Sequence, residues 1–379
     1  MSHLFPNYAR KPFEIVKGTG LTVEDQSGKA YLDFTSGIGV VNLGHHYPAV
    51  ETALAQQAAQ LWHMPNLYEN HLQEEVAADL AGEMDYVGYF CNSGAEANEA
   101  AIKLARKYTG KSKIVTFQQS FHGRTYGAMS ATGQDSIHAG FQPLVPDFHY
   151  GIYNDQTSID TLIDPQTAAV LVELIQGEGG VVPAEKKWLH ALAKKCSETG
   201  ALLMVDEVQT GMGRTGTLFA FQQFDIQPDI FTLAKGLGNG IPVGAMLGKQ
   251  KLAKAFGAGT HGSTFGGNKL AMAAAKAVIT TMKAPGFFET VNERSEELFA
   301  GLAAITSDKI VAVRGLGLMV GIQLISPEVL TEVSAALEAK GLLTLRAGQN
   351  VLRLLPALTV SQVEIQQALH LLREVLENK

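Results

Sequence analysis

The distribution of apolar and polar positions divides the chain into alternating strand-like and helix-like stretches. Apolar runs typical of buried strands are KIVTF, AAVLVELI, ALLMVDEV and DIFTLAK, at 113–117, 168–175, 201–208 and 229–235. Between the second and third runs lies KKWLHALAKKCSETG, whose apolar residues recur with helical spacing up to Gly200. Near-continuous apolar strands with helical crossovers are typical of a mostly parallel sheet that is covered on both faces. We therefore predict an α/β fold.

The pattern changes toward both ends of the chain. Helical spacing over about 288–303 and about 361–377, with the run KIVAVRGLGLMVGIQL between them, indicates a separate α+β unit. The N-terminal part, with the turn DQSG and the strand-like KAYLDF, also lies outside the α/β alternation. We predict one small domain built from both ends and one large central domain, with the boundaries 1–48, 49–284 and 285–379.

Composition narrows the class of protein. Charged residues make up 18% of the 379 residues and the formal net charge is −7, which disfavours disorder and bulk nucleic-acid binding. The cysteines, Cys91 and Cys196, have no CxxC partner, so we expect both to be reduced. Signal-peptide and membrane-spanning patterns are absent from the sequence. We expect a cytoplasmic protein that binds neither nucleic acid nor a membrane.

The segment NSGAEANEAAIKLARKY predicts a helix with an anion site at its start. Ser93 and Glu96 have the spacing of a capping box. The first N–H groups of a helix are unpaired and lie at its positive end, and Gly94 and Ala95 carry no bulk that would block a phosphate there. A capped structural helix is the alternative for this motif alone.

Two strand ends carry further candidate groups. In VDEVQTG, Asp206 and Glu207 follow an apolar strand, where ligands of parallel α/β sheets are found. Asp206 is a candidate partner for a cationic ring nitrogen, with a helix cap or a solvated loop acid as the alternative. Lys235 ends the apolar run DIFTLAK, where desolvation would lower its pKa and free an amine for Schiff-base chemistry. An ordinary surface lysine is the alternative.

Arginine, aromatic and hydroxyl side chains complete the candidates. Arg124 lies in the Gly-rich FHGRTYGAMSATG and Arg353 in the apolar NVLRLLPAL, and both are suited to binding carboxylates. An interdomain ion pair is the alternative for Arg353. Phe121 is a candidate stacking platform or a core residue. Ser263 and Thr264, in GTHGSTFGGN, are candidate ligands of a phosphate or substrate, or turn residues.

Six ordered motifs resemble those of the class III, fold type I aminotransferases that depend on pyridoxal phosphate. The motifs are NSGAEANEAAIKLARK, FHGRT, QGEGG, VDEVQTGMGRTG, TLAKGLGNGIPVGA and GSTFGGN, and the resemblance covers nearly the whole chain. The chain departs from the family pattern at Leu174, Asn239 and Lys269, and none of these changes removes a reactive group. Metal-ligand spacing is absent around His45, His46 and His71, so we predict no metal. The lone GLGLMVG, at 315–321, is not a GxGxxG between a strand and a helix, so we predict no nicotinamide cofactor.

The resemblance implies pyridoxal 5′-phosphate, one per subunit, held as a Schiff base on Lys235. Asp206 would pair with the pyridinium nitrogen and Phe121 would stack on the ring. The helix start at Ser93 would hold the phosphate, helped by Thr264 of the other subunit in a homodimer. The cofactor-binding residues implied are Ser93, Gly94, Ala95, Phe121, Asp206, Glu207, Val208, Gln209, Lys235 and Thr264, with Gln209 at the 3-oxygen.

The resemblance also implies the substrates. Arg124 and Ser263 would bind the amine donor, and Arg353 would bind 2-oxoglutarate. Glu178, in QGEGG, would pair with Arg353 during the donor half-reaction and move away for the dicarboxylate. The expected reaction transfers the terminal amine of N2-acetyl-L-ornithine to 2-oxoglutarate, in arginine biosynthesis. Another ω-amine donor, an aminomutase and a non-enzymatic relative are the alternatives.

Overall fold

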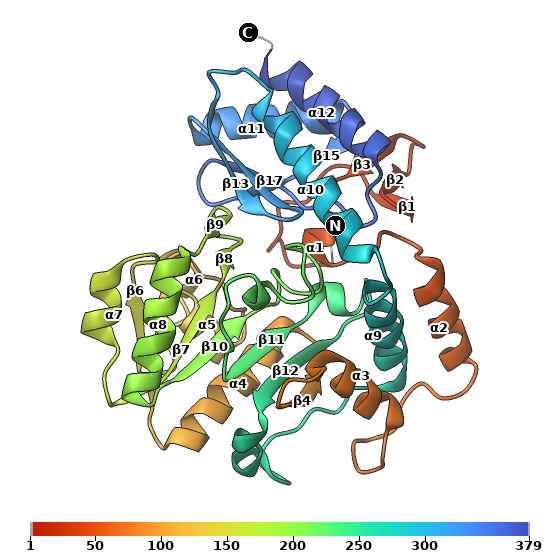
Figure 1. Cartoon of the computed structure of the whole chain (residues 1–379). Helices are drawn as coiled ribbons and strands as arrows, with labels where there is room; N and C mark the ends of the chain where they lie inside the picture. The colour runs from red at the N-terminus through yellow and green to blue at the C-terminus, as the bar shows by residue number, and fades with distance from the viewer. Residues whose placement is uncertain (1–2, 378–379) are drawn as a thin grey trace.

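A computed structural model of the chain describes residues 3–377, and its centre is a seven-stranded sheet (Figure 1). β12 runs antiparallel to β4 and β11, and the other neighbouring pairs are parallel, so the predicted mostly parallel sheet is confirmed. The strand order is β4 (Tyr86–Cys91), β12 (Gly244–Lys249), β11 (Ile230–Leu233), β10 (Leu202–Asp206), β7 (Thr167–Glu173), β5 (Lys113–Phe117) and β6 (Phe148–Gly151).

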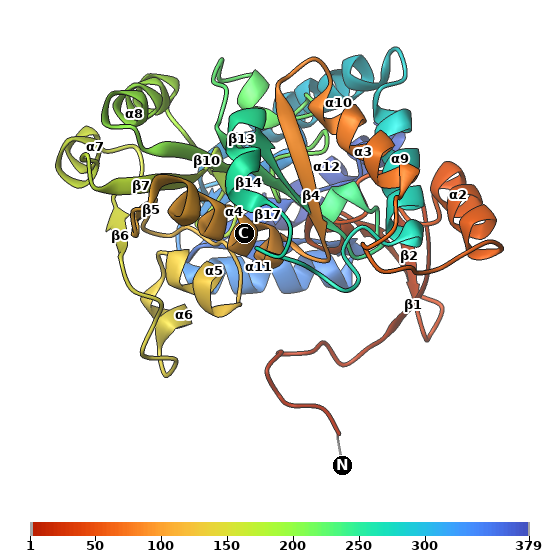
Figure 2. The same cartoon turned by 90° about the horizontal axis from the view of Figure 1, so that it is seen from below.

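Helices cover both faces of this sheet because alternate strand residues point to opposite sides. On one face, Leu171 and Met204 share a core with Leu104 of α4 (Gly94–Thr109). On the other face, Val172 shares a core with Leu189 of α8 (Lys186–Thr199). α7 (Gln156–Leu162) lies beside α8, and α2 (Pro48–Ala58), α3 (His71–Ala81) and α9 (Lys269–Met282) lie at the other end of the sheet (Figures 1 and 2).

The two ends of the chain meet in a separate four-stranded sheet. It contains β1 (Ile15–Thr19), β2 (Thr22–Asp25) and β3 (Ala30–Asp33), and β15 (Leu342–Leu343) pairs parallel to β3. An N-terminal strand and a C-terminal strand therefore belong to one sheet. The exact domain boundaries at 48 and 284 stay a prediction.

The C-terminal part forms another four-stranded sheet, which lies above the central sheet in Figure 1. Three helices pack together beside this sheet. The strands in sheet order are β13 (Ile310–Leu316), β14 (Met319–Leu324), β17 (Val351–Leu354) and β16 (Leu345–Ala347), and the helices are α10 (Phe287–Ala303), α11 (Pro327–Ala339) and α12 (Gln362–Leu376). α10 and α12 begin and end close to the predicted positions, whereas α11 was not predicted.

Short elements connect these parts around the sheet ends. The two-stranded ribbon of β8 (Ile175–Gln176) and β9 (Val182–Pro183) carries the QGEGG loop between its strands. α1 (Ser36–Gly39), α5 (Tyr126–Ala131) and α6 (Asp135–His138) lie in connecting loops. The three-residue turn η2 (Lys235–Leu237) follows β11 directly. Loops that bear four of the six motifs thus follow the strands β4, β5, β10 and β11.

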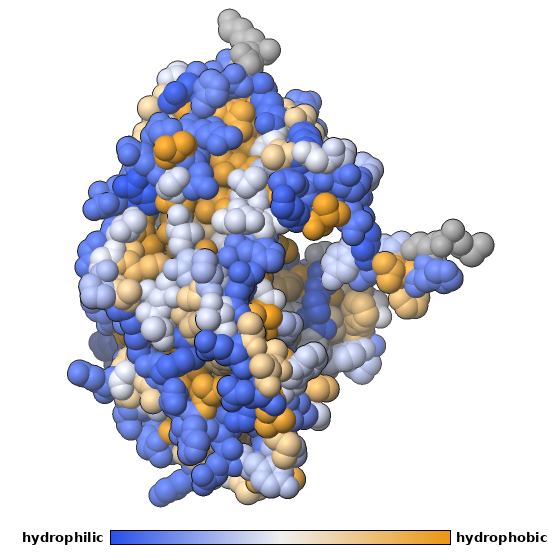
Figure 3. Space-filling view, turned by 90° about the vertical axis from the view of Figure 1, so that its right-hand side faces the viewer, coloured by the Kyte–Doolittle hydropathy of each residue, from blue (hydrophilic) through white to orange (hydrophobic). Residues whose placement is uncertain are grey.

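The surface has two notable properties. The segment before β1 stands away from the rest of the molecule (Figures 2 and 3), and its Leu4, Phe5 and Tyr8 side chains are exposed. Among the helices of residues 3–377, none combines the length and the apolar character needed to cross a membrane.

Candidate active site

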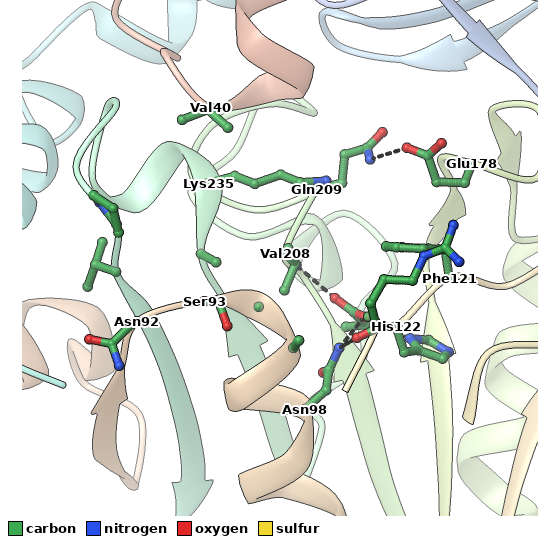
Figure 4. A pocket seen from close by; sticks show the side chains of 18 of the residues that line it. Val40, Asn92, Ser93, Asn98, Phe121, His122, Glu178, Val208, Gln209 and Lys235 are labelled. Carbon is green, nitrogen blue, oxygen red and sulfur yellow. Dashed lines mark hydrogen bonds and ion pairs between the residues drawn. The ribbon is translucent and has the colours of Figure 1, made fainter. Parts of the chain in front are cut away.

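A cavity of about 450 Å³ lies where the loops after β4, β5, β10 and β11 come together. Figure 4 shows side chains from these loops pointing toward one another around it. Ten of the predicted site residues belong to its wall: Ser93, Gly94, Ala95, Phe121, Arg124, Glu178, Asp206, Val208, Gln209 and Lys235.

The start of α4 forms one wall of the cavity. The Ser93 hydroxyl accepts a hydrogen bond from the amide of Glu96, as the capping motif predicts. The Glu96 carboxylate, however, accepts from the amide of Asn92 at 2.7 Å, one residue before the usual position. Among the described residues, nothing accepts a hydrogen bond from the amides of Gly94 and Ala95. These two N–H groups are available to an anion at the positive end of the helix.

Gly94 has a packing reason to be glycine. A Cβ at this position would lie 2.7 Å from Cγ1 of Val208, a distance that real side chains do not reach. The helix start therefore lies directly against the loop after β10. Because Gly94 and Ala95 line the cavity and their amides have no acceptor among the described residues, the residues present fit the phosphate of the implied cofactor.

Asp206, at the end of β10, is held by three hydrogen bonds. Its Oδ2 accepts from Asn98 Nδ2 at 2.8 Å and interacts with His122 Nδ1 at 2.7 Å, and its Oδ1 accepts from the amide of Val208. His122 Nε2 lies 3.2 Å from Thr116 Oγ1. The carboxylate is buried and fixed in orientation, as is required of a group that pairs with a ring cation.

Lys235 begins the turn η2 in a left-handed backbone conformation, with φ of 43°. This conformation is unfavourable for a residue with a side chain, and such outliers concentrate at functional sites. Burial lowers the pKa of Lys235, although the Glu178 carboxylate opposes the shift. A larger fraction of the amine is therefore neutral and nucleophilic than for an exposed lysine.

An ion pair closes one side of the cavity. Arg353 Nη1 donates to Glu178 Oε1 at 2.7 Å and to Gln209 Oε1 at 3.0 Å. Burial acts to raise the pKa of Glu178. The charge and hydrogen bond of Arg353, together with the Lys235 charge and the Gln209 hydrogen bond, outweigh it, and the pKa lies below its usual value. Arg353 is 2% exposed, and its Nε has no hydrogen-bond partner among the described residues. A buried arginine with an unused donor is suited to a carboxylate ligand.

Four predicted site residues lie outside the cavity wall. Glu207 points the other way, because neighbouring strand residues face opposite sides, and it accepts hydrogen bonds from Phe221 N and Thr210 Oγ1. Ser263 and Thr264 line a separate hollow of about 710 Å³. Arg353 lies behind Glu178 and Gln209. Gln209 itself lines the cavity but bonds to the Glu178–Arg353 pair.

Sequence reasoning missed four polar residues of the wall, Asn92, Asn98, His122 and Glu173. His122 and Asn98 hold Asp206, and Glu173, at the end of β7, accepts from Phe121 N at 2.9 Å and from Gly177 N at 3.3 Å. Burial raises the pKa of Glu173, helped by the nearby Asp206 charge and opposed by His122. The position of His122 within FHGRT and of Asn98 on the first turns of an Ala-rich helix were the available signals.

Comparison with known proteins gives a consistent result. A sequence model of the family described as Aminotransferase class-III matches residues 5–376. An acetylornithine aminotransferase of Streptococcus mutans is 56% identical, covering 100% of this chain and 99% of that protein, and one of Listeria innocua is 57% identical, with the same coverage.

Solved structures agree. An ornithine aminotransferase of Toxoplasma gondii superposes with a TM-score of 0.95 at 31% identity, covering 99% of this chain and 92% of that one. An N-acetylornithine aminotransferase of Stenotrophomonas maltophilia gives 0.83 at 36% identity, with coverages of 98% and 97%. The fold is that of the transaminases that depend on pyridoxal phosphate. The chain belongs to the class III aminotransferase family.

Proposed function

We propose that the protein is an acetylornithine aminotransferase of arginine biosynthesis and acts in the cytoplasm. It would transfer the terminal amine of N2-acetyl-L-ornithine to 2-oxoglutarate, giving N-acetyl-L-glutamate 5-semialdehyde and L-glutamate. The observation that carries the proposal is the ion pair of the buried Arg353 with the half-buried Glu178, which lines the same cavity as Lys235. The full-length identity to acetylornithine aminotransferases supports the choice of donor.

The residues of the cavity fit pyridoxal phosphate. The free amides of Gly94 and Ala95 would hold its phosphate, Asp206 its ring nitrogen and Phe121 its ring face. Lys235 would hold it covalently. When bound, the cofactor supplies an electron sink that stabilises negative charge on the carbon next to the reacting amine.

The chain's own residues would do the remaining work. Asp206, fixed by Asn98 and His122, would keep a positive charge stable at the ring nitrogen. Lys235, whose amine burial favours in the neutral form, would accept and return a proton at its Nζ. Glu173 would hold the Phe121 backbone in place at the end of β5.

The charged residues around the cavity support a donor that has one carboxylate and an acceptor that has two. Arg124 lies over the Phe121 ring at 5.8 Å and lines the cavity, where it would bind the α-carboxylate of the donor. Glu178 would neutralise Arg353 while the donor is bound. When Glu178 moves away, Arg353 would bind the carboxylate next to the keto group of 2-oxoglutarate.

We infer that the active unit is a homodimer in which Thr264 and Ser263 complete the partner's site. Asn66 Nδ2 donates to the carbonyl of Gly266, so the 61–68 segment lies against the loop that carries Thr264. Large exposed apolar side chains gather here: Trp62, Leu67, Tyr68 and Phe265. Such a patch is typical of a protein–protein contact. Light scattering is expected to give twice the mass of one chain, and a monomer would contradict this inference.

A donor panel tests the proposed reaction. The enzyme loaded with pyridoxal phosphate is mixed with acetylornithine, ornithine or 4-aminobutyrate, and the visible cofactor absorbance is followed before 2-oxoglutarate is added. Acetylornithine is expected to give the fastest change and the highest kcat/KM. Absence of any change with every ω-amine would contradict a transaminase, and a preference for ornithine or 4-aminobutyrate would contradict the assigned donor.

A further inference from the structure

A second hollow, of about 620 Å³, opens beside the cavity, and we call it the outer hollow. It shares Phe121, Arg124 and Glu178 with the cavity, so the two spaces communicate. Its outer walls come from residues 134–137, around the start of α6, and from residues 346–349, at the end of β16 and in the turn that leads to β17.

The turn between β16 and β17 is fixed against the cavity. The amide of Gly348 donates to the carbonyl of Glu178 at 2.7 Å. Gly348 has φ of 52°, and a Cβ there would lie 3.2 Å from the carbonyl oxygen of Gly179. This close contact brings Arg346, two residues earlier, to the edge of the outer hollow.

The outer hollow carries two arginines that have no acidic partner among the described residues, Arg124 and Arg346. Arg346 donates one hydrogen bond, from Nη2 to Thr331 Oγ1 at 3.0 Å, and a guanidinium has five N–H donors. Two carboxylates also border the hollow. Glu178 is already paired with Arg353, which leaves Asp135 as the unpaired acid.

The position of Arg124 decides which part of the donor enters the outer hollow. In the proposed function, the donor's terminal amine is at Lys235 and its α-carboxylate is at Arg124. The acyl group is attached through nitrogen to the carbon that carries that carboxylate. Because Arg124 lies at the junction of the two spaces, the acyl group must extend away from Lys235 and into the outer hollow.

We propose that Arg346 and Asp135 set the charge selectivity of the outer hollow for the acyl group of the donor. Arg346 favours an acyl chain that ends in a carboxylate, and Asp135 disfavours it. An acetyl group is uncharged, so neither Arg346 nor Asp135 attracts or repels it. This inference rests on the proposed function and adds a specificity-determining pair to it.

The test compares two donors in the enzyme loaded with pyridoxal phosphate: N2-acetyl-L-ornithine and N2-succinyl-L-ornithine, which carries an extra carboxylate. The measured quantity is the ratio of their kcat/KM values, succinyl over acetyl. Arg346→Gln is expected to lower this ratio about threefold to fivefold, as for a solvent-exposed ion pair. Arg346→Lys keeps the charge and should keep most of the ratio, whereas Asp135→Asn should raise it about twofold.

Ionic strength gives a second measurement that does not depend on the variants folding equally well. Between about 0.02 M and about 0.5 M KCl the wild-type ratio should fall, and the ratio of Arg346→Gln should fall less. A ratio that is unchanged by both substitutions, or no wild-type turnover of the succinyl donor, would overturn the inference while the proposed function stands. Absence of acetylornithine turnover would overturn both.

Discussion

The cavity and the outer hollow differ in how their polar groups are held. In the cavity, Asp206 is bonded by Asn98, His122 and the Val208 amide, and it has no freedom to reorient without losing these bonds. In the outer hollow, Arg124 and Arg346 are exposed and lack acidic partners within residues 3–377.

This difference separates the residues that carry out the reaction from the residues that select the substrate. Groups that act at the reacting atoms must be pre-organised, and a dense hydrogen-bond network supplies that. Groups that choose between an amine donor and a dicarboxylate must be free to change partners. Glu178 lies at the boundary, because it belongs to both spaces and shares Arg353 with Gln209.

The largest effect is expected at Lys235, because its amine would take part in the reaction itself. Lys235→Ala is expected to lower kcat about 1000-fold or more, since the proton-transferring amine is lost. Folding should be retained, because the backbone of the turn is unchanged. The measurement is steady-state turnover with circular dichroism as the check on folding. Lys194→Ala, at an exposed position of α8, is the matched control and should behave as wild type. Ordinary activity of Lys235→Ala would refute the assignment of the site.

Glu178 lies at the boundary of the two spaces, and Glu178→Ala should change the preference among substrates more than the rate of the reaction. Arg353 becomes unmasked and attracts α-carboxylates, so the preference for acetylornithine over glutamate as amine donor should fall about tenfold. The ratio of kcat/KM for the two donors measures this. Glu178→Gln keeps the shape but not the charge, and it should shift the ratio in the same direction. An unchanged ratio in both variants would show that Glu178 is not a switch.

Local patterns allowed much of the fold to be predicted. The apolar runs of β5, β7, β10 and β11 and the C-terminal glycine of α8 follow from short-range sequence, because strand burial and helix capping depend on neighbours in the chain. Ser93, Asp206 and Lys235 could be singled out because each lies where a predicted element begins or ends.

Contacts between residues that are far apart in the chain could not be predicted from the sequence. Glu173 joins the Phe121 and Gly177 amides only because β5 and β7 are adjacent in the sheet. The position of Arg346 could not be predicted either, because it depends on the contact of Gly348 with Glu178 and Gly179. The expectation that Glu207 binds the cofactor is wrong, because neighbouring strand residues face opposite sides and Glu207 therefore faces away from Asp206.

The last prediction concerns the stability of the fold and the buried Glu207, which lies outside the cavity wall. Burial raises the pKa of Glu207 to about 7, although bonds from Thr210 and Phe221 oppose the shift. The folded state therefore retains a proton that the unfolded chain releases near its ordinary value of 4.5. Stability should fall as pH rises from about 4.5 to about 7, by on the order of 2–3 kcal/mol from this group.

In Glu207→Gln that contribution is removed, so the variant should gain stability relative to wild type between pH 5 and pH 8. Urea unfolding at both pH values measures the difference, and Glu293→Gln, at an exposed site on α10, is the matched control. If Glu207→Gln and wild type lose stability in parallel over this range, Glu207 is ionised in the folded protein. That outcome would contradict the raised pKa of Glu207.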